Sequence, residues 1–429
     1  MKSFTSVLAS CLLVPHLYGQ SQKIITSDVD HFWAAYDKIV QSKDSTEQYR
    51  YLQSLYLDPA SEGLKALMEV RRYDAKGYLD AIRQYPQFWN SIRGNTLRSK
   101  TLSKEIEAEI ARLKKLYPSL KPSTIYFSVG LFRSNGTIQG NKVLIGSEMA
   151  LSSKTVDVSG MPDHVKEFNT LYNPMHDIGL LCTHEYVHTQ QKPLVDNLLS
   201  YCIYEGIAEF ISTLATGKAS YVKAIAYGKH NYLKVREQFE RDVFIPSHTY
   251  NWLWSSNKLF DHRDLGYSVG FEMAERYYKQ AKDKTKAIKD MIELDFENEA
   301  QVENYVDQSG YLSKPLNTLF EEFERTRPKV TGLLEFENGS QQVPASTSRI
   351  TLAFSEPMDT DSRGFDYGPL GEEQVLRVQN VIGFSEDRRS FTFEVKLEPG
   401  RRYQCLVSNR FASQAGIPLK PYLIDIRTQ

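Results

Sequence analysis

The amino-acid sequence predicts an α+β protein in two parts: a mostly helical domain with a small sheet, followed by an all-β sandwich. Apolar residues recur at helical spacing over most of the chain between Ser27 and Arg327. Beyond that stretch, short segments of alternating apolar and polar residues are separated by Gly and Pro, as is typical of strands and turns. A length of 429 residues allows two or three domains.

The composition narrows the classes of function. Apolar residues make up 41% of the chain and charged residues 24%, as in ordinary folded proteins. Aromatic residues reach 12%, more than a disordered chain carries. The formal net charge is -1, so we expect neither a nucleic-acid partner nor binding to an acidic membrane surface.

The first residues have the pattern of an export signal. Lys2 provides a positive start, and the mostly apolar stretch Phe4–Val14 is too short to remain in a bilayer. Gly19 before Gln20 offers a cleavage point. We therefore expect a signal peptide over residues 1–19 and an exported protein, whether periplasmic, secreted or at the cell surface. A buried N-terminal helix is the alternative.

A second kind of export signal is also present in outline. Leu8-Ala9-Ser10-Cys11 resembles the cleavage box of a bacterial lipoprotein. It lies very early, and apolar residues follow Cys11 where a polar tether is expected, so an outer-membrane lipoprotein is disfavoured. No later stretch is long and apolar enough to predict a transmembrane segment.

The helical part contains one small predicted sheet. Ser27 and Asp28 are candidate N-caps of the first helix, and prolines at 118 and 122 end the first helical run. Strands are predicted over Thr124–Val129 and Val143–Gly146, with turn signals at Asn135-Gly136 and Gly140-Asn141. Later helices are expected over Asp177–Gln191, Leu198–Leu214, Tyr221–Phe239, Tyr267–Lys282 and Thr285–Ile292, and later strands over Ile350–Phe354, Phe391–Val395 and Tyr403–Val407.

His184 and His188 stand four residues apart in the segment HEYVH, within a predicted helix. Positions i and i+4 share a helix face with Cβ atoms about 5–6 Å apart, so both imidazoles can bind one ion. Each would lie about 2.0–2.1 Å from zinc. Glu185 lies off that face, where it can take a proton from water at the metal without binding the ion.

The next predicted helix supplies a third ligand. A catalytic zinc site needs three protein ligands and one open position for water. Glu205 provides that ligand, while Gly206 and Ala208 are small enough for two helices to approach closely. Glu209 lies one turn further on the same face, where it can accept a hydrogen bond from a liganding histidine and fix its tautomer.

Three cysteines remain after removal of the signal: Cys182, Cys202 and Cys405. An odd number fits no disulfide framework. Cys182 and Cys202 flank the predicted metal site and can pair in an oxidising compartment. The favoured interpretation is two buried thiols that pack as small apolar residues.

HEYVH followed by YEGIAEF resembles the gluzincin clan of metallopeptidases, the clan of thermolysin and aminopeptidase N. The aminopeptidase N class carries HExxH and then an NEGFA-type segment. The resemblance implies that Glu205 is the third ligand and that Glu209 is the acid that supports a ligand. Downstream, DLGYSVGF is similar to the YxxG segment of the class, whose tyrosine hydrogen-bonds the tetrahedral intermediate. Tyr267 is the matching position.

The resemblance is partial. The gap between His188 and Glu205 is slightly shorter than in the aminopeptidase N class, and the GAMEN-type segment that anchors a free amine is absent. Aminopeptidase activity is therefore not implied. The stretch from VDHFW through YPSL, YFSVG and DLGYSVG is closer to an uncharacterised bacterial family of predicted zinc-dependent proteases, over most of residues 28–325.

The last part has a resemblance of its own. ITLAFSEPMD, LEPGRRYQCLV and AGIPL are similar to bacterial Ig-like domains of secreted proteins, which implies no catalytic residues there. The expected organisation is a signal peptide over 1–19, a zinc metallopeptidase domain over 20–327 and an Ig-like β-sandwich over 328–429.

The expected function is hydrolysis of a peptide or protein substrate, with zinc as cofactor, Glu185 as general base and Tyr267 as oxyanion donor. The alternatives are a non-catalytic binding protein that retains a metalloprotease fold, and an adhesion protein in which the Ig-like domain binds. Glu185 favours catalysis, because a structural zinc site does not need it. Substrate specificity, endo- or exo-cleavage and oligomeric state stay open.

Overall fold

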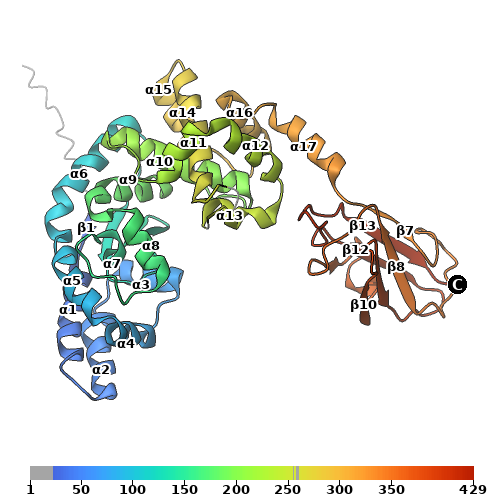
Figure 1. Ribbon diagram of the computed structural model, residues 1–429, viewed down its shortest axis with the longest axis horizontal. Helices are drawn as coiled ribbons and strands as arrows, with labels where there is room; N and C mark the ends of the chain where they lie inside the picture. The colour runs from blue at the N-terminus through green and yellow to red at the C-terminus, as the bar shows by residue number, and fades with distance from the viewer. Residues whose placement is uncertain (1–22, 255, 258–259) are drawn as a thin grey trace, which may run out of the picture. The chain divides into compact units, whose positions relative to one another are not determined.

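The computed structural model describes residues 23–254, 256–257 and 260–429 (Figure 1). The predicted signal peptide and Cys11 lie outside the described residues. The chain divides into two compact units, one of residues up to Gln191 together with Ile211–Tyr221, and one of Lys192–Phe210 together with Val222–Gln429. Among the described residues, no helix has the length and apolar character needed to cross a membrane.

After one short strand, the first unit continues with a run of helices, as the apolar periodicity predicts. These are α1 (Ser27–Ile39), α2 (Ser45–Leu52), the π-helical turn η1 (Gln53–Leu57), α3 (Glu62–Arg71), α4 (Ala75–Gln84), α5 (Pro86–Leu97) and α6 (Ser99–Leu116). Buried aromatic residues join them. Phe32 of α1 lies 5.3 Å from Tyr56 and 5.0 Å from Trp89 between ring centroids.

The start of α1 differs from the prediction. The helix begins at Ser27, and no side chain caps it. Asp28 is fully buried and accepts hydrogen bonds from the Ser61 backbone NH at 2.9 Å and from the Ser128 hydroxyl at 2.8 Å. Its carboxylate thus joins α1 to the start of α3 and to a strand, because a buried carboxylate needs donors wherever the tertiary structure supplies them.

A four-stranded mixed sheet follows, in the order β1-β2-β4-β3. Its strands are β1 (Ile24–Ile25), β2 (Thr124–Ser128), β3 (Gly136–Gln139) and β4 (Lys142–Gly146). β3 pairs antiparallel with β4, whereas the β1–β2 and β2–β4 pairs are parallel. The predicted turn at Gly140-Asn141 joins β3 to β4, and Gly140 has the positive φ of 58° that favours glycine.

The first unit then returns to helices: α7 (Ser147–Ala150), α8 (Asp163–Leu171), the 3-10 turn η2 (Pro174–Asp177) and α9 (Ile178–His188). β3 and β4 both pack against α9, and so does α6. The small sheet and the long helix α6 therefore hold α9 in place.

The second unit contains most of α10 (Leu198–Thr216) and the later helices. The predicted helix over Tyr221–Phe239 is two helices, α11 (Lys223–His230) and α12 (Tyr232–Asp242). The chain continues through η3 (Pro246–His248), α13 (Thr249–Leu253), β5 (Ser256–Asn257), β6 (His262–Arg263), α14 (Leu265–Gln280), α15 (Lys284–Ile292), α16 (Glu299–Ser309) and α17 (Leu316–Thr326).

After α17 the chain is all β, as predicted. The strands are β7 (Val330–Leu333), β8 (Arg349–Phe354), β9 (Phe365–Asp366), β10 (Asn380–Phe384), β11 (Ser390–Glu394), β12 (Arg402–Val407) and β13 (Tyr422–Arg427), with the turn η4 (Glu372–Gln374). Two antiparallel sheets, β10-β11-β8-β7 and β13-β12-β9, share one apolar core that includes Leu352, Phe393 and Ile424. The period-2 alternation places these side chains on the inner faces.

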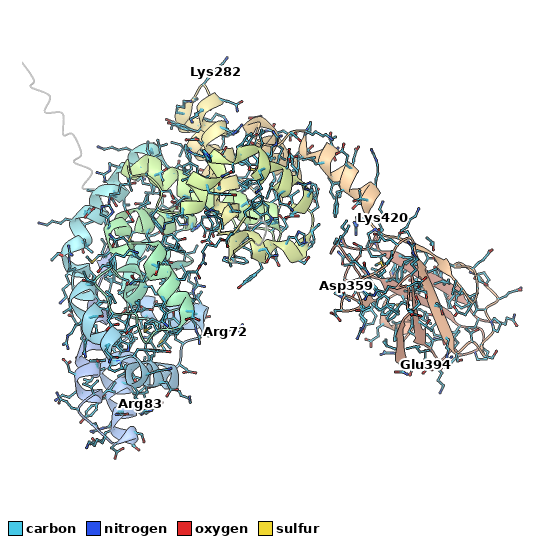
Figure 2. The ribbon with its side chains drawn as sticks, viewed as in Figure 1. Arg72, Arg83, Lys282, Asp359, Glu394 and Lys420 are labelled. Carbon is cyan, nitrogen blue, oxygen red and sulfur yellow. The ribbon has the colours of Figure 1, made fainter. Side chains whose placement is uncertain are left out.

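Charged side chains mark the outer surface. Figure 2 shows Arg83 and Lys282 projecting from the helical region, and both are exposed. This distribution is ordinary for a folded domain and makes buried charged groups informative.

Candidate metal centre

Helix α9 is buried on every side. All eleven of its residues, from Ile178 to His188, are buried. The segment IGLLCT before the HEYVH motif carries no charge, so the core can close around it. Desolvated polar side chains need partners, and α9 brings two histidines and a glutamate into the interior: His184, Glu185 and His188.

The two histidines direct the same ring nitrogen at one point. His184 and His188 are 7% and 6% exposed, and their Nε2 atoms lie 2.9 Å apart. The ring planes are nearly perpendicular, at 85°, with centroids 4.6 Å apart. The i, i+4 spacing on a helix thus produces the predicted convergence.

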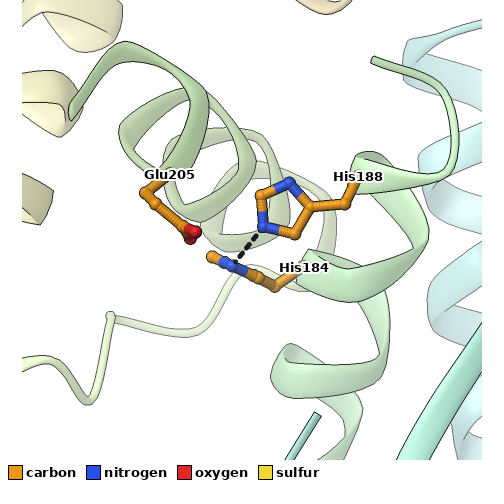
Figure 3. Close-up of side chains that lie close together, drawn as sticks. All are labelled: His184, His188 and Glu205. Atoms are coloured by element: carbon orange, nitrogen blue, oxygen red, sulfur yellow. Dashed lines mark hydrogen bonds between the residues drawn. The ribbon is translucent and has the colours of Figure 1, made fainter. Parts of the chain in front are cut away.

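Glu205 completes a group of three ligand atoms. One ligand atom each from His184, His188 and Glu205 lies within 4.8 Å of the others. Figure 3 shows the histidines on one helix and Glu205 on another, with their polar ends pointing toward one another. Two ligands about 2.0–2.1 Å from a tetrahedral ion stand about 3.4 Å apart, so the group has the dimensions for a small metal ion. Two imidazoles and one carboxylate suit zinc and other first-row divalent ions.

Gln191 is a site residue that sequence reasoning missed. Its side-chain oxygen lies 2.7 Å from Nδ1 of His188. A carboxamide oxygen can only accept, so Nδ1 of His188 carries the proton and Nε2 presents its lone pair. This contact fixes the tautomer that metal binding requires, as supporting hydrogen bonds do in metal sites. The only signal for Gln191 in the sequence is its position three residues after His188.

Glu185 lies against the edge strand β3. A Cβ atom at Gly136 would stand 2.6 Å from Oε1 of Glu185, so glycine leaves the space that this carboxylate fills. Asn135-Gly136 was predicted as a turn, but Gly136 is the first residue of β3. Glycine is needed there for close packing against Glu185, and the turn itself is at Gly140-Asn141.

Glycine also explains how α10 is held. A Cβ atom at Gly206, next to Glu205, would come within 2.0 Å of the backbone carbon of Gly270 on α14. A Cβ at Gly270 would lie 1.7 Å from the carbonyl oxygen of Cys202. The two helices therefore touch through their backbones. The expected close approach at Gly206 is present, and its partner is α14.

The remaining predicted residues lie on these same two helices. Tyr267 is half-buried and stands three residues, about one turn, before Gly270 on α14. Glu209 is 1% exposed on α10, one turn after Glu205. The roles of these two residues stay predictions.

The described cysteines are free thiols. Cys182, Cys202 and Cys405 are all buried and unpaired with one another, so the favoured interpretation of buried thiols is confirmed. Burial raises the pKa of Cys182 and of Cys202 well above the ordinary value, and raises that of Cys405 to about 12. These thiols stay protonated and are poor metal ligands at neutral pH.

Comparison with known proteins gives no family. No family model matches the chain, and no curated protein matches it. Among solved structures, the surface-layer protein SbsC matches at 10% identity and a TM-score of 0.19, over 94% of this chain and 44% of that one. The N-terminal part of the bacterial S-layer protein SbsC matches at 11% identity and a TM-score of 0.19, over 94% and 77%. The chain spans less than half the length of the first of these. Superpositions of this quality assign neither a fold nor a function.

Proposed function

We propose that this protein is a zinc-dependent peptidase of the HExxH type, with His184, His188 and Glu205 as metal ligands. The observation that carries the proposal is the convergence of these three ligand atoms within 4.8 Å, with Glu185 beside the first ligand. The likeness of HEYVH and YEGIAEF to gluzincin motifs supports the same assignment. A purely structural site would gain nothing from a buried carboxylate at 185.

The proposed mechanism gives each residue one task. His184, His188 and Glu205 would hold the zinc ion, which would supply Lewis acidity for the scissile carbonyl and would lower the pKa of water toward about 7. Glu185 takes the proton of the attacking water and returns it to the leaving amine. Tyr267 donates a hydrogen bond to the developing oxyanion. Gln191 orients His188 through Nδ1, and Glu209 supports a liganding histidine.

The edge strand β3 supports a peptide as the substrate class. Among the described strands of its sheet, β3 is the last and pairs only with β4, so it forms an edge of that sheet. Gly136, its first residue, touches the space filled by Glu185. An extended peptide that adds to this edge would therefore run past the proposed base, with backbone hydrogen bonds holding its main chain.

We also propose the organisation into a peptidase domain over 20–327 and a β-sandwich domain over 328–429, in an exported protein. The common apolar core of the two C-terminal sheets supports the second domain.

Metal content and peptide cleavage, measured together, test the function. We expect about one zinc per chain and hydrolysis of casein or of a mixed peptide library. A chelator should abolish the hydrolysis, and added zinc should restore it. Purified protein that holds no metal, or that cleaves equally well after its metal is removed, would refute the proposal.

A further inference from the structure

A groove in the second unit lies where α10 begins. Its volume is about 480 Å³. Its walls come from the start of α10 and the residues before it, the segment after α12, the segment before α16, and helices α16 and α17. Asn409 and Pro418 of the β region also line it. The apolar wall includes Leu198, Val243, Phe244, Phe296, Val302 and Phe320.

Helix α17 leaves part of its apolar face uncovered along this groove. Leu316, Phe320 and Phe323 recur at i, i+4 and i+7, the spacing of a core-facing helix. Leu319 is nevertheless its one buried residue, and Phe320 is 45% exposed. Phe244 covers the face in part, with ring centroids 5.4 Å from both phenylalanines. An apolar face left open in this way marks a binding surface.

The rim of the groove is acidic. Glu297, Glu299 and Glu303 all line it, and no ion pair joins them to a cation in the described part of the chain. Arg327, which also lines the groove, already pairs with Glu324 at 2.5 Å. Uncompensated carboxylates around an apolar cavity attract a ligand that is both cationic and apolar.

The groove and a proposed metal ligand share one helix. Leu198 lines the groove and Glu205 stands seven residues later on α10, which is two turns along the same face. The rise over these turns is about 10 Å, a span that an extended peptide covers in about three residues.

From the apolar wall, the acidic rim and this spacing, we infer that the groove binds a cationic, apolar segment of the peptide substrate, about three residues from the bond that is cut. The inference rests on the proposed function, because it takes the bound peptide to be the substrate of a peptidase. The groove itself belongs to residues that take no part in metal binding or proton transfer.

Direct binding tests the inference without hydrolysis. The full chain with Glu185→Gln is titrated into three fluorescently labelled peptides by anisotropy: Lys alternating with Phe, Glu alternating with Phe, and Lys alternating with Ser. The Lys/Phe peptide should bind most tightly. The triple variant Glu297→Gln/Glu299→Gln/Glu303→Gln should weaken it at least about fivefold at low salt, and the difference should shrink as salt rises.

A matched variant controls for net charge. Glu337→Gln/Glu373→Gln/Glu386→Gln removes three exposed carboxylates from the β region and should leave the affinity unchanged. Phe320→Ala should weaken the Lys/Phe peptide and leave the Lys/Ser peptide unaffected. The inference would be overturned if the Glu185→Gln chain bound all three peptides with equal affinity. It would also be overturned if both triple variants lost the same amount of affinity for the Lys/Phe peptide.

The same variants separate this inference from the proposed function. If the Lys/Phe peptide binds in the groove but the parent hydrolyses no peptide, the groove stands and the peptidase assignment fails. If the parent hydrolyses the Lys/Phe peptide and the rim variant does so with the same KM, the peptidase assignment stands and the groove assignment fails.

Discussion

Helices α9 and α17 depart from the ordinary amphipathic pattern in opposite directions. α9 buries all eleven of its residues, two histidines and a glutamate among them. α17 buries one residue of eleven and leaves a phenylalanine 45% exposed. Burial of ionisable groups costs free energy unless they are paired or bind a metal, and exposure of apolar surface forgoes stabilisation. Each departure is thus unfavourable for folding alone, and this is why we propose a binding role in both places.

The largest expected effect comes from substitutions at the histidines of α9 and at the glutamine that contacts one of them. His188→Ala should lose most of the bound zinc, because two ligands hold the ion far more weakly than three. Gln191→Ala removes only the acceptor for Nδ1 and should lower zinc affinity about 10–100-fold. Competition with a chromophoric chelator measures both. Stoichiometric zinc in a His184→Ala/His188→Ala double variant would show that the buried histidines of α9 are not ligands.

The next effect concerns the backbone contact that holds Glu205. Gly206→Ala should destabilise the protein by about 3 kcal/mol, because the new Cβ would meet the backbone of Gly270 at 2.0 Å. Gly94→Ala is the matched control: it lies within α5, and nothing stands within 4 Å of its Cβ position. That change should stabilise by about 0.5–1 kcal/mol. Urea unfolding measures both variants. Similar values for the two would refute the close crossing of α10 and α14.

Glu148 is a buried carboxyl group outside the metal group, and its pKa shows the effect of burial on an acidic side chain. Burial raises the pKa of Glu148 from 4.5 to about 7, although hydrogen bonds from the Gly130 and Phe132 backbone NH groups lower it. The folded state therefore binds the proton more tightly than the unfolded chain. Its contribution to stability is complete below pH 4.5 and is lost as the pH rises toward 7, by up to about 3 kcal/mol.

Glu148→Gln cannot titrate, so the difference in unfolding free energy between parent and variant isolates this carboxyl group. The parent should lose stability relative to the variant between pH 4.5 and 7. Metal-related changes affect both proteins alike. Parallel pH profiles would contradict the assignment of a protonated, buried Glu148.

The smallest expected effect tests whether the apolar face of α17 is open to solvent. Leu319→Ala should cost about 2 kcal/mol because this side chain is 8% exposed, whereas Phe320→Ala should cost under about 1 kcal/mol. Urea unfolding of the two variants gives the comparison directly. If removal of the Phe320 ring costs as much as removal of Leu319, the face of α17 is covered in solution and is not an open binding surface.

The sequence was sufficient where local spacing determines the structure. His184 and His188 converge because a helix places i and i+4 together, and the strands after α17 follow from alternation. The sequence was insufficient where contacts between residues far apart in the chain determine the structure. Nothing local shows that Asp28 would bind Ser61 and Ser128 in place of capping α1, or that Gly136 leaves room for Glu185. The Gly206–Gly270 contact likewise depends on how α10 and α14 cross.

The most direct test of the central claim is the Glu185→Gln variant, assayed for zinc and for peptide hydrolysis on the same sample. We expect a full complement of zinc and a folded protein, with hydrolysis reduced about 10²–10⁴-fold by loss of the general base. Hydrolysis as fast as the parent's, with zinc retained, would contradict it.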